Sequence, residues 1–255
     1  MKRKEIIAAC FRSLCQRKRE RIGMKDNNRI MENQELLDYV GGYINAFEVG
    51  FPIYKNRLAE KLQKDFGIGK KDSTVIATVA FDKIMDTGRI SNLRLYRKGI
   101  YYRTESTSFG ELGINKEQLI ADKYLVPDIG YETGFTVLHR MGLTTQMPVK
   151  RSIVSNAVTA YCLDRELDVE VYPPRERITD ANKLYFQLLD VLALIKQAPI
   201  DAENPYNVIA NYIQKCELQY GKLRIFAELY YGKEVISELD SVRYFCTLYK
   251  HEDVR

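Results

Sequence analysis

Two carboxylates alternate along a predicted strand in the second half of the chain. Asp168 and Glu170 flank Val169, and the apolar residues of the segment point to its other side. A metal-dependent nuclease needs two or more carboxylates to hold Mg²⁺, usually with a lysine nearby. No lysine follows at the spacing that would place it on the same side of the strand as this pair, so a solvated outer strand face is the favoured interpretation. A metal-dependent nuclease stays open as an alternative.

Other residue types that support catalysis are sparse. The chain has two histidines, and its five cysteines include no C-x-x-C pair, which indicates neither a metal site nor a disulfide framework. His139 lies on an apolar predicted helix, and Cys162 lacks a convincing partner histidine. There is no P-loop and no glycine-rich dinucleotide motif in a suitable context. We therefore expect a protein that is not an enzyme and uses no metal or cofactor.

Basic residues are concentrated in the first part of the chain. Residues 1–30 carry ten bases and three acids, and residues 50–103 carry twelve bases and five acids, whereas residues 104–255 have a net charge of −5. A basic front and an acidic back suggest an anionic partner for the front, such as nucleic acid.

The first 30 residues include the basic cluster Arg17-Lys18-Arg19-Glu20-Arg21. We interpret them as a basic arm that follows phosphates, as a disordered tail, or as an extension ahead of a true start at Met24 or Met31. They fail as a signal peptide, because Arg12 interrupts the apolar run. No stretch approaches the roughly 18–20 apolar residues of a membrane span. We expect a cytoplasmic protein with no membrane partner.

Residues 31–104 are predicted to form a winged helix-turn-helix domain. Apolar spacing changes from about 3.6 residues to two along this region, as expected for helices followed by strands. The expected elements are helices over 33–46 and 54–66, a helix capped by Asp72 or Ser73 and ended by Gly88, and strands over 89–95 and 99–103. Three helices followed by a β-hairpin is the winged-helix order.

A helix of this kind presents its early residues to base edges in the major groove. The predicted DNA-binding residues are Lys70, Lys71, Ser73, Thr74 and Thr78 around the third helix, and Arg94, Arg97 and Lys98 on the wing. Ala77 is expected on the same exposed face. Asp82 and Asp86 would be repelled by phosphates and are expected to face away from DNA. A protein-interaction module is the alternative for this domain.

Residues 105–255 are predicted to form an α+β domain with a helical C-terminal end, so the fold class is α+β overall. A helix over 131–141 would bury Phe135, Leu138 and Met141, and Gly142 would end it. Thr144, Thr145 and Gln146 mostly suit local backbone hydrogen bonds. The other expected elements are strands over 153–158 and 167–172, a helix from Thr179 or Asp180 to about Gln197, and helices over 204–220, 222–231 and 233–248.

Two segments carry a family resemblance. The first contains Gly88-Arg89-Ile90 and, after a basic turn, Gly99-Ile100-Tyr101-Tyr102. The second contains Gly142-Leu143-Thr144-Thr145-Gln146, preceded by Thr136-Val137 where the family pattern has an alanine. Together they resemble AbiEi-type antitoxins, the transcriptional regulators of type IV toxin–antitoxin (abortive infection) systems. Residues 200–255 match nothing specific.

The resemblance implies a DNA-binding transcriptional repressor that binds repeats in its own promoter as double-stranded DNA, with a homodimer as one form on DNA. It also implies an antitoxin domain that counters a nucleotidyltransferase-like toxin, with or without a stable complex. One alternative is a stand-alone winged-helix transcriptional regulator whose second domain senses a signal or dimerises. The other is the nuclease that would use Asp168 and Glu170.

Overall fold

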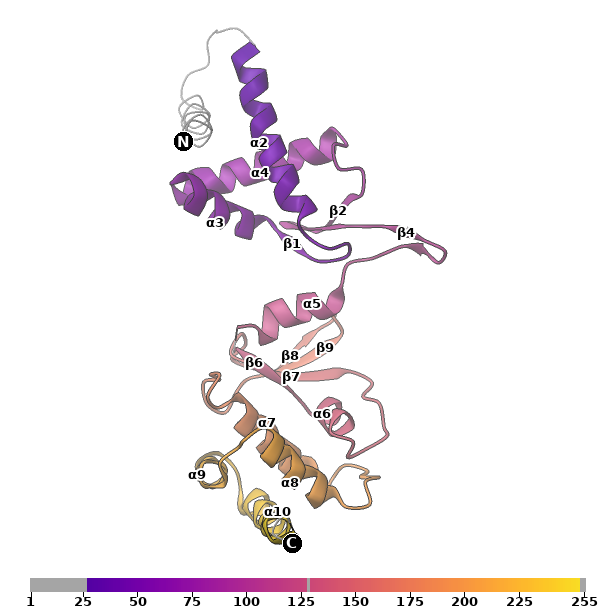
Figure 1. Cartoon of the computed structure of the whole chain (residues 1–255), viewed down its shortest axis with the longest axis vertical. Coiled ribbons are helices and arrows are strands. Elements are labelled where there is room, and N and C mark those ends of the chain that lie inside the picture. Colours follow the sequence, from indigo (N-terminus) through magenta and orange to yellow (C-terminus); the bar gives the residue numbers. More distant parts are fainter. Residues whose placement is uncertain (1–26, 128, 253–255) are drawn as a thin grey trace. The chain divides into compact units, whose positions relative to one another are not determined.

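The structure is a computed structural model that describes residues 27–127 and 129–252. The predicted basic arm, residues 1–30, therefore lies almost entirely outside the described residues. Helices and small sheets alternate along the chain, as expected for an α+β protein (Figure 1). The chain divides into two compact units, the first ending at Gln118 and the second starting at Leu119.

In its described part, from residue 27 on, the first unit combines three helices with two small sheets. Its elements are α2 (Asn27–Asn45), β1 (Ile53–Tyr54), α3 (Lys55–Phe66), α4 (Lys70–Asp86), β2 (Leu93–Arg97), β3 (Ile100–Arg103), β4 (Ser106–Thr107) and β5 (Gly110–Glu111). Strand β3 lies between β1 and β2, and both pairings are antiparallel. The β2–β3 hairpin turns at Gly99, whose φ of 84° is the positive value that such a turn needs.

The core of this unit is built by the apolar stripes that the sequence pattern indicates. Leu58 and Leu62 of α3 are fully buried against α4, whose Phe81 stacks on Tyr101 of β3 with ring centroids 4.2 Å apart. Helix α3 ends at Gly67, which has a φ of 66° and donates its N–H to the carbonyl of Gln63. The sheet is thus fixed to the helix pair through a continuous apolar core.

Several predicted boundaries in this unit are wrong, and the helix expected over 33–46 already begins at Asn27. Helix α4 begins at Lys70, with Gly69 as the N-cap in an extended conformation, so neither Asp72 nor Ser73 caps it. Strand β2 begins at Leu93 rather than Arg89, whose guanidinium instead forms an ion pair with Asp38 of α2.

The β4–β5 hairpin belongs to the first unit, so the division falls later than the predicted boundary after residue 104. The hydroxyl of Thr104 donates to the carbonyl of Leu112 over 2.8 Å. The backbone N–H of Asn115 donates to the carbonyl of Gly50 over 2.8 Å. The first bond closes the segment around the β4–β5 hairpin, and the second ties this segment back to the loop that precedes β1.

The second unit packs helices on one mixed sheet. Its elements are α5 (Lys116–Ile120), which spans the division, the π-helical turn η1 (Ala121–Leu125), β6 (Gly130–Thr133), α6 (Phe135–Arg140), β7 (Arg151–Ser155), β8 (Cys162–Asp164), β9 (Val169–Tyr172), α7 (Lys183–Leu194), α8 (Pro205–Lys215), α9 (Tyr220–Tyr230) and α10 (Lys233–Glu252). The strand order is β6-β7-β9-β8, with β7 parallel to β9 and the other pairs antiparallel.

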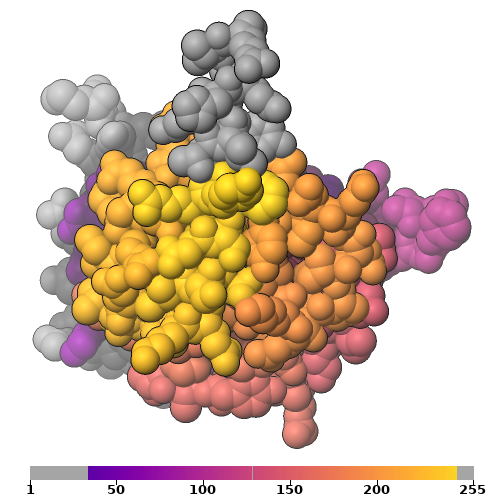
Figure 2. All heavy atoms as spheres, turned by 90° about the horizontal axis from the view of Figure 1, so that it is seen from below, coloured from indigo at the N-terminus to yellow at the C-terminus, as the bar shows by residue number. Residues whose placement is uncertain are grey.

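Helix α7 forms the apolar centre of this unit. Leu188, Leu189 and Val191 are buried in one core with residues from α8, α9 and α10. Figure 2 looks onto this helical end, where α10 in yellow lies beside orange segments of the chain. The predicted long apolar helix is confirmed, although it ends at Leu194 and begins at Lys183 after an Asn182 cap.

The predicted helix over 131–141 is wrong in its first part. Residues 130–133 form strand β6. Gly134, with a φ of 66°, separates this strand from α6, which starts at Phe135. Phe135 is exposed, whereas Val137 and Leu138 are buried. Gly142 does end the helix, since its φ is 75° and Leu143 N–H donates to the carbonyl of Leu138.

The last helices follow the predicted order with one difference. Gly221 lies inside α9 and does not separate two helices, whereas Gly232 does separate α9 from α10. Within the described part of the chain, no helix is both long enough and apolar enough to cross a membrane.

Candidate functional site

The start of α4 is an exposed basic surface. Lys70 and Lys71 are exposed, and so is Thr74 one turn later. Among the described residues, the amino groups of Lys70, Lys71 and Lys98 take part in no hydrogen bond or ion pair. These three cations are therefore available to an anionic ligand.

Two residues expected on this surface are not on it. Ser73 and Ala77 are fully buried, because both lie on the stripe of α4 that packs on the core. The hydroxyl of Ser73 donates to the carbonyl of Lys70 over 2.9 Å. The prediction that Ser73 contacts DNA and that Ala77 is exposed is therefore wrong in the folded unit.

The two threonines of α4 use their hydroxyl protons within the helix. Thr74 Oγ1 donates to the carbonyl of Lys70, and Thr78 Oγ1 donates to the carbonyl of Thr74, each over 2.8 Å. Each oxygen keeps acceptor capacity, and each methyl group is a contact surface for a thymine methyl. Thr74 is exposed and Thr78 is half-buried.

The acidic residues of α4 are exposed near its far end. Asp82 and Asp86 both lie on the solvent side. With a rise of about 1.5 Å per residue, Asp82 lies roughly 18 Å along the axis from Lys70. Distance along the helix, and not burial, separates these carboxylates from the basic start.

The β2–β3 hairpin carries the other predicted cations. Arg97 and Lys98 are exposed beside the Gly99 turn. Arg94 differs, because its Nη2 lies 2.9 Å from Glu111 Oε1 and its Nη1 donates to the carbonyl of Ser91 over 2.8 Å. The guanidinium of Arg94 is thus occupied in joining this hairpin to β5.

The structure adds a neighbour to the hairpin that sequence reasoning missed. The N–H of Lys55 donates to the carbonyl of Gly99 over 2.9 Å, so the first turn of α3 lies against the hairpin turn. Arg57 follows on the same turn, with its guanidinium 4.5 Å from the centre of the Tyr54 ring. The sequence signal for this neighbour was the set of basic residues around the apolar stripe of α3, namely Lys55, Arg57, Lys61 and Lys64, which also fits a solvated helix face.

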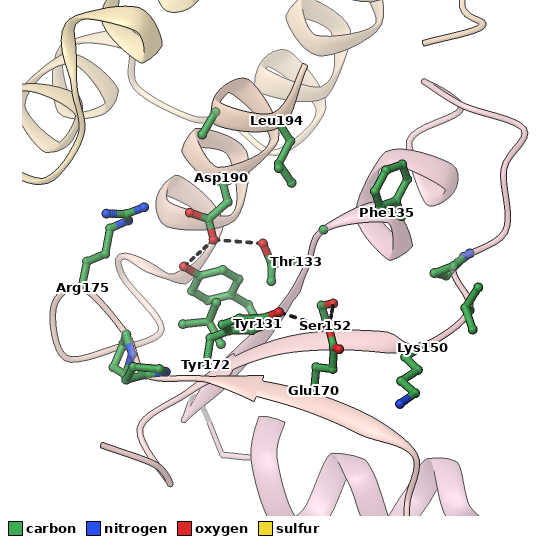
Figure 3. A pocket seen from close by; sticks show the side chains of 17 residues that line it. Tyr131, Thr133, Phe135, Lys150, Ser152, Glu170, Tyr172, Arg175, Asp190 and Leu194 are labelled. Atoms are coloured by element: carbon green, nitrogen blue, oxygen red, sulfur yellow. Dashed lines mark hydrogen bonds between the residues drawn. The ribbon is translucent and has the colours of Figure 1, made fainter. Parts of the chain in front are cut away.

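The second unit contains a cavity of about 1060 Å³ between its sheet and α7. Strands β6, β7 and β9 form one wall, with Thr133, Ser152 and Glu170 facing the space (Figure 3). Asp190 and Leu194 of α7 lie opposite.

Asp190 is held by three hydroxyl groups. Tyr131 and Thr133 each donate to Oδ2 over 3.0 Å, and Tyr231 donates to Oδ1 over 2.7 Å. Burial raises the pKa of Asp190 even though these hydrogen bonds and Arg175 act to lower it. Burial and the nearby carboxylate in turn raise the pKa values of Tyr131 and Tyr231. The cluster ties β6 to α7 and to the segment after α9.

Asp168 and Glu170 do not form one site. Glu170 lines the cavity, whereas Asp168 precedes β9 in a left-handed conformation, with a φ of 53°, and is exposed. Its carboxylate lies 3.9 Å from Lys150. No group of three or more His, Cys, Asp or Glu side chains that could hold a metal ion occurs among residues 27–127 and 129–252. The geometry gives the nuclease alternative no support.

The Gly142–Gln146 segment is anchored by a distant carboxylate. Asp201 Oδ2 accepts the N–H and the hydroxyl of Thr145, each over 2.7 Å, and lies 3.3 Å from the hydroxyl of Thr144. These hydrogen bonds hold the pKa of Asp201 below its usual value. The threonines therefore bind a loop of the same unit, and only Thr144 accepts a local backbone N–H, from Gln146.

No protein-family model matches the chain, and no curated protein matches it. The antitoxin interpretation therefore depends on the two sequence segments alone.

Proposed function

We propose that the first unit is a winged helix that binds double-stranded DNA, and that the protein acts as a transcriptional repressor. The observation that carries the proposal is the order α2-β1-α3-α4-β2-β3 with β3 between β1 and β2. This order supports a winged helix, in which α4 would be the helix for the major groove and β2–β3 the wing.

The exposed basic side chains of this unit support DNA as the partner. Lys70 and Lys71 stand at the start of α4, and Arg97 and Lys98 stand at the wing turn. Thr74 and Thr78 follow along α4, and small polar side chains there can contact base edges while lysines contact phosphates. Lys55 and Arg57 extend the basic surface beside the wing.

We further propose the antitoxin role for the second unit, acting against a nucleotidyltransferase-like toxin. The support is the resemblance of the Gly142–Gln146 segment to AbiEi-type antitoxins. The test is growth rescue: co-expression should restore growth of cells that express the neighbouring gene. Unchanged toxicity, or a neighbouring gene that is harmless, would leave a stand-alone regulator as the better description.

An electrophoretic shift tests the DNA proposal directly. DNA from upstream of the gene is titrated with the protein at two salt concentrations, against a scrambled competitor. We expect specific retardation that weakens as salt rises, because phosphate contacts release counterions. Absence of binding at low salt would instead make the first unit a protein-contact module.

A double substitution locates the interface. Lys70→Ala with Lys71→Ala should weaken binding, whereas Lys222→Ala with Lys233→Ala should not. The control pair removes the same charge from exposed lysines of the second unit. An equal loss in the two variants would show that net charge, and not α4, governs binding.

A further inference from the structure

The cavity of the second unit has one charge without an opposite partner. Four charged side chains line it: Lys150, Glu170, Arg175 and Asp190. Lys150 lies 3.9 Å from Asp168, and the positive charge of Arg175 acts on Asp190. Glu170 forms no ion pair with any described residue. Two basic and two acidic side chains thus line the cavity, and Glu170 is a carboxylate among them that has no ion-pair partner within the described part of the chain.

Weak hydroxyl contacts surround the Glu170 carboxylate. Oε2 lies 3.1 Å from the hydroxyl of Tyr172 and 3.5 Å from that of Ser152, and Oε1 lies 3.4 Å from the hydroxyl of Tyr161. Two of these distances are at the long end for hydrogen bonds between oxygens. A stronger, charged donor would find unused acceptor capacity here.

Aromatic and apolar groups adjoin this carboxylate. The rings of Tyr161 and Tyr172 lie 5.2 Å apart, and Tyr172 borders the cavity together with Pro173, Val149 and Phe135. Figure 3 shows Glu170 and Ser152 together on the sheet wall, with Lys150 to one side of them and Arg175 to the other. A carboxylate beside aromatic rings attracts a cation through both charge and the ring faces.

We propose that this cavity binds a small organic cation, with an ammonium or guanidinium group at Glu170 and an apolar or aromatic body against Tyr172 and Phe135. The volume of about 1060 Å³ accommodates a molecule of that size. This site is separate from the proposed DNA surface, and its test uses no DNA, so either proposal can fail alone.

Isothermal titration calorimetry of the full chain with three compounds of similar shape tests the site. Tyramine carries an ammonium group, 4-ethylphenol is its neutral counterpart, and 3-(4-hydroxyphenyl)propanoate carries a carboxylate. We expect tyramine to bind roughly tenfold or more tightly than either counterpart, because only it offers a charged donor to Glu170. Agmatine, which carries both a guanidinium and an amine, serves as a second cation.

Variants assign the preference to Glu170. Glu170→Gln should remove the difference between tyramine and 4-ethylphenol, and Tyr172→Leu should weaken tyramine while thermal unfolding stays cooperative. Glu203→Gln, which removes an exposed carboxylate outside the cavity, should leave binding unchanged. The proposal is overturned if neither cation binds, if the three compounds bind alike, or if folded Glu170→Gln keeps the preference.

Discussion

Arg94 of β2 and Glu111 of β5 form an ion pair, with 2.9 Å between Nη2 and Oε1. This contact joins the predicted wing to the hairpin that follows it. Arg94 is half-buried, whereas Arg97 and Lys98 lie at the turn and are exposed.

The wing turn is expected to contact phosphates. Arg97→Ala combined with Lys98→Ala should weaken binding to every DNA sequence and flatten the dependence of log K on log salt by about one to two units. Shift assays over a salt series measure the slope. Arg94→Ala is the comparison and should change the slope less, because Glu111 already neutralises Arg94. An unchanged slope in the double variant would show that the wing turn does not contact phosphates.

The adjacent residues Ser73 and Thr74 of α4 should have different roles, the first in stability and the second in DNA recognition. Thr74→Ala should change the preference among DNA sites by about 1 kcal/mol, because Thr74 is exposed on the proposed groove face. Ser73→Ala should cost about 1 kcal/mol of stability and leave site preference unchanged, because its buried hydroxyl bonds Lys70. Competition binding and urea unfolding separate the two effects. A uniform loss of affinity with Thr74→Ala would contradict base contact.

Acid should weaken the second unit through Asp164. Burial would raise the pKa of Asp164, but hydrogen bonds from Lys123, Tyr124 and the N–H of Leu167 outweigh it and lower the pKa to about 2. A lowered folded pKa stabilises the fold above the unfolded pKa of about 3.9 and loses that contribution as pH falls toward 2.

The corresponding variant should remove that pH dependence. Asp164→Asn should cost on the order of 1 kcal/mol near neutral pH and flatten stability between about pH 5 and pH 2, a modest effect because the pair is partly open to solvent. Denaturant unfolding across this range measures it. The exposed Asp168→Asn serves as control, and equal curves for the two variants would refute the assignment.

The Gly142–Gln146 segment should depend on Asp201. Asp201→Ala removes the acceptor of the Thr145 N–H, so hydrogen exchange at that amide should become faster. Glu203→Ala, two residues later and exposed, should not change it. Unaltered protection in the Asp201 variant would mean that other contacts hold the loop.

Two glycines should respond oppositely to alanine. A Cβ at Gly130 would lie 2.1 Å from the carbonyl oxygen of Tyr124 and 2.7 Å from that of Val154. Because backbone atoms cannot move aside as a flexible side chain can, Gly130→Ala should lower the free energy of unfolding by about 3 kcal/mol. Gly221→Ala should raise the free energy of unfolding by roughly 0.5–1 kcal/mol, because Gly221 is inside helix α9 with open space around it. Thermal and urea unfolding of the two variants decide the matter.

The sequence alone determined the elements with strong periodicity. The stripes of Leu58 and Leu62, and of Leu188 and Val191, placed α3 and α7, because burial of apolar side chains at helical spacing is a local signal. Gly99, Gly142 and Gly232 were correctly placed at turns or helix ends. Gly99 and Gly142 have the positive φ that glycine adopts freely, and Gly232 lies between α9 and α10, since glycine is unfavourable inside a helix.

Tertiary structure decided which polar residues are accessible. Ser73 and Thr74 are similar neighbours in the sequence, yet only the packing of α4 on the core buries the first and exposes the second. Strand β6 was missed because its partners lie in β7 and α7, and such pairing leaves little local pattern. The same long-range pairing brings Glu170 to Ser152 and Asp190 to Tyr131, Thr133 and Tyr231, contacts that no spacing along the chain encodes.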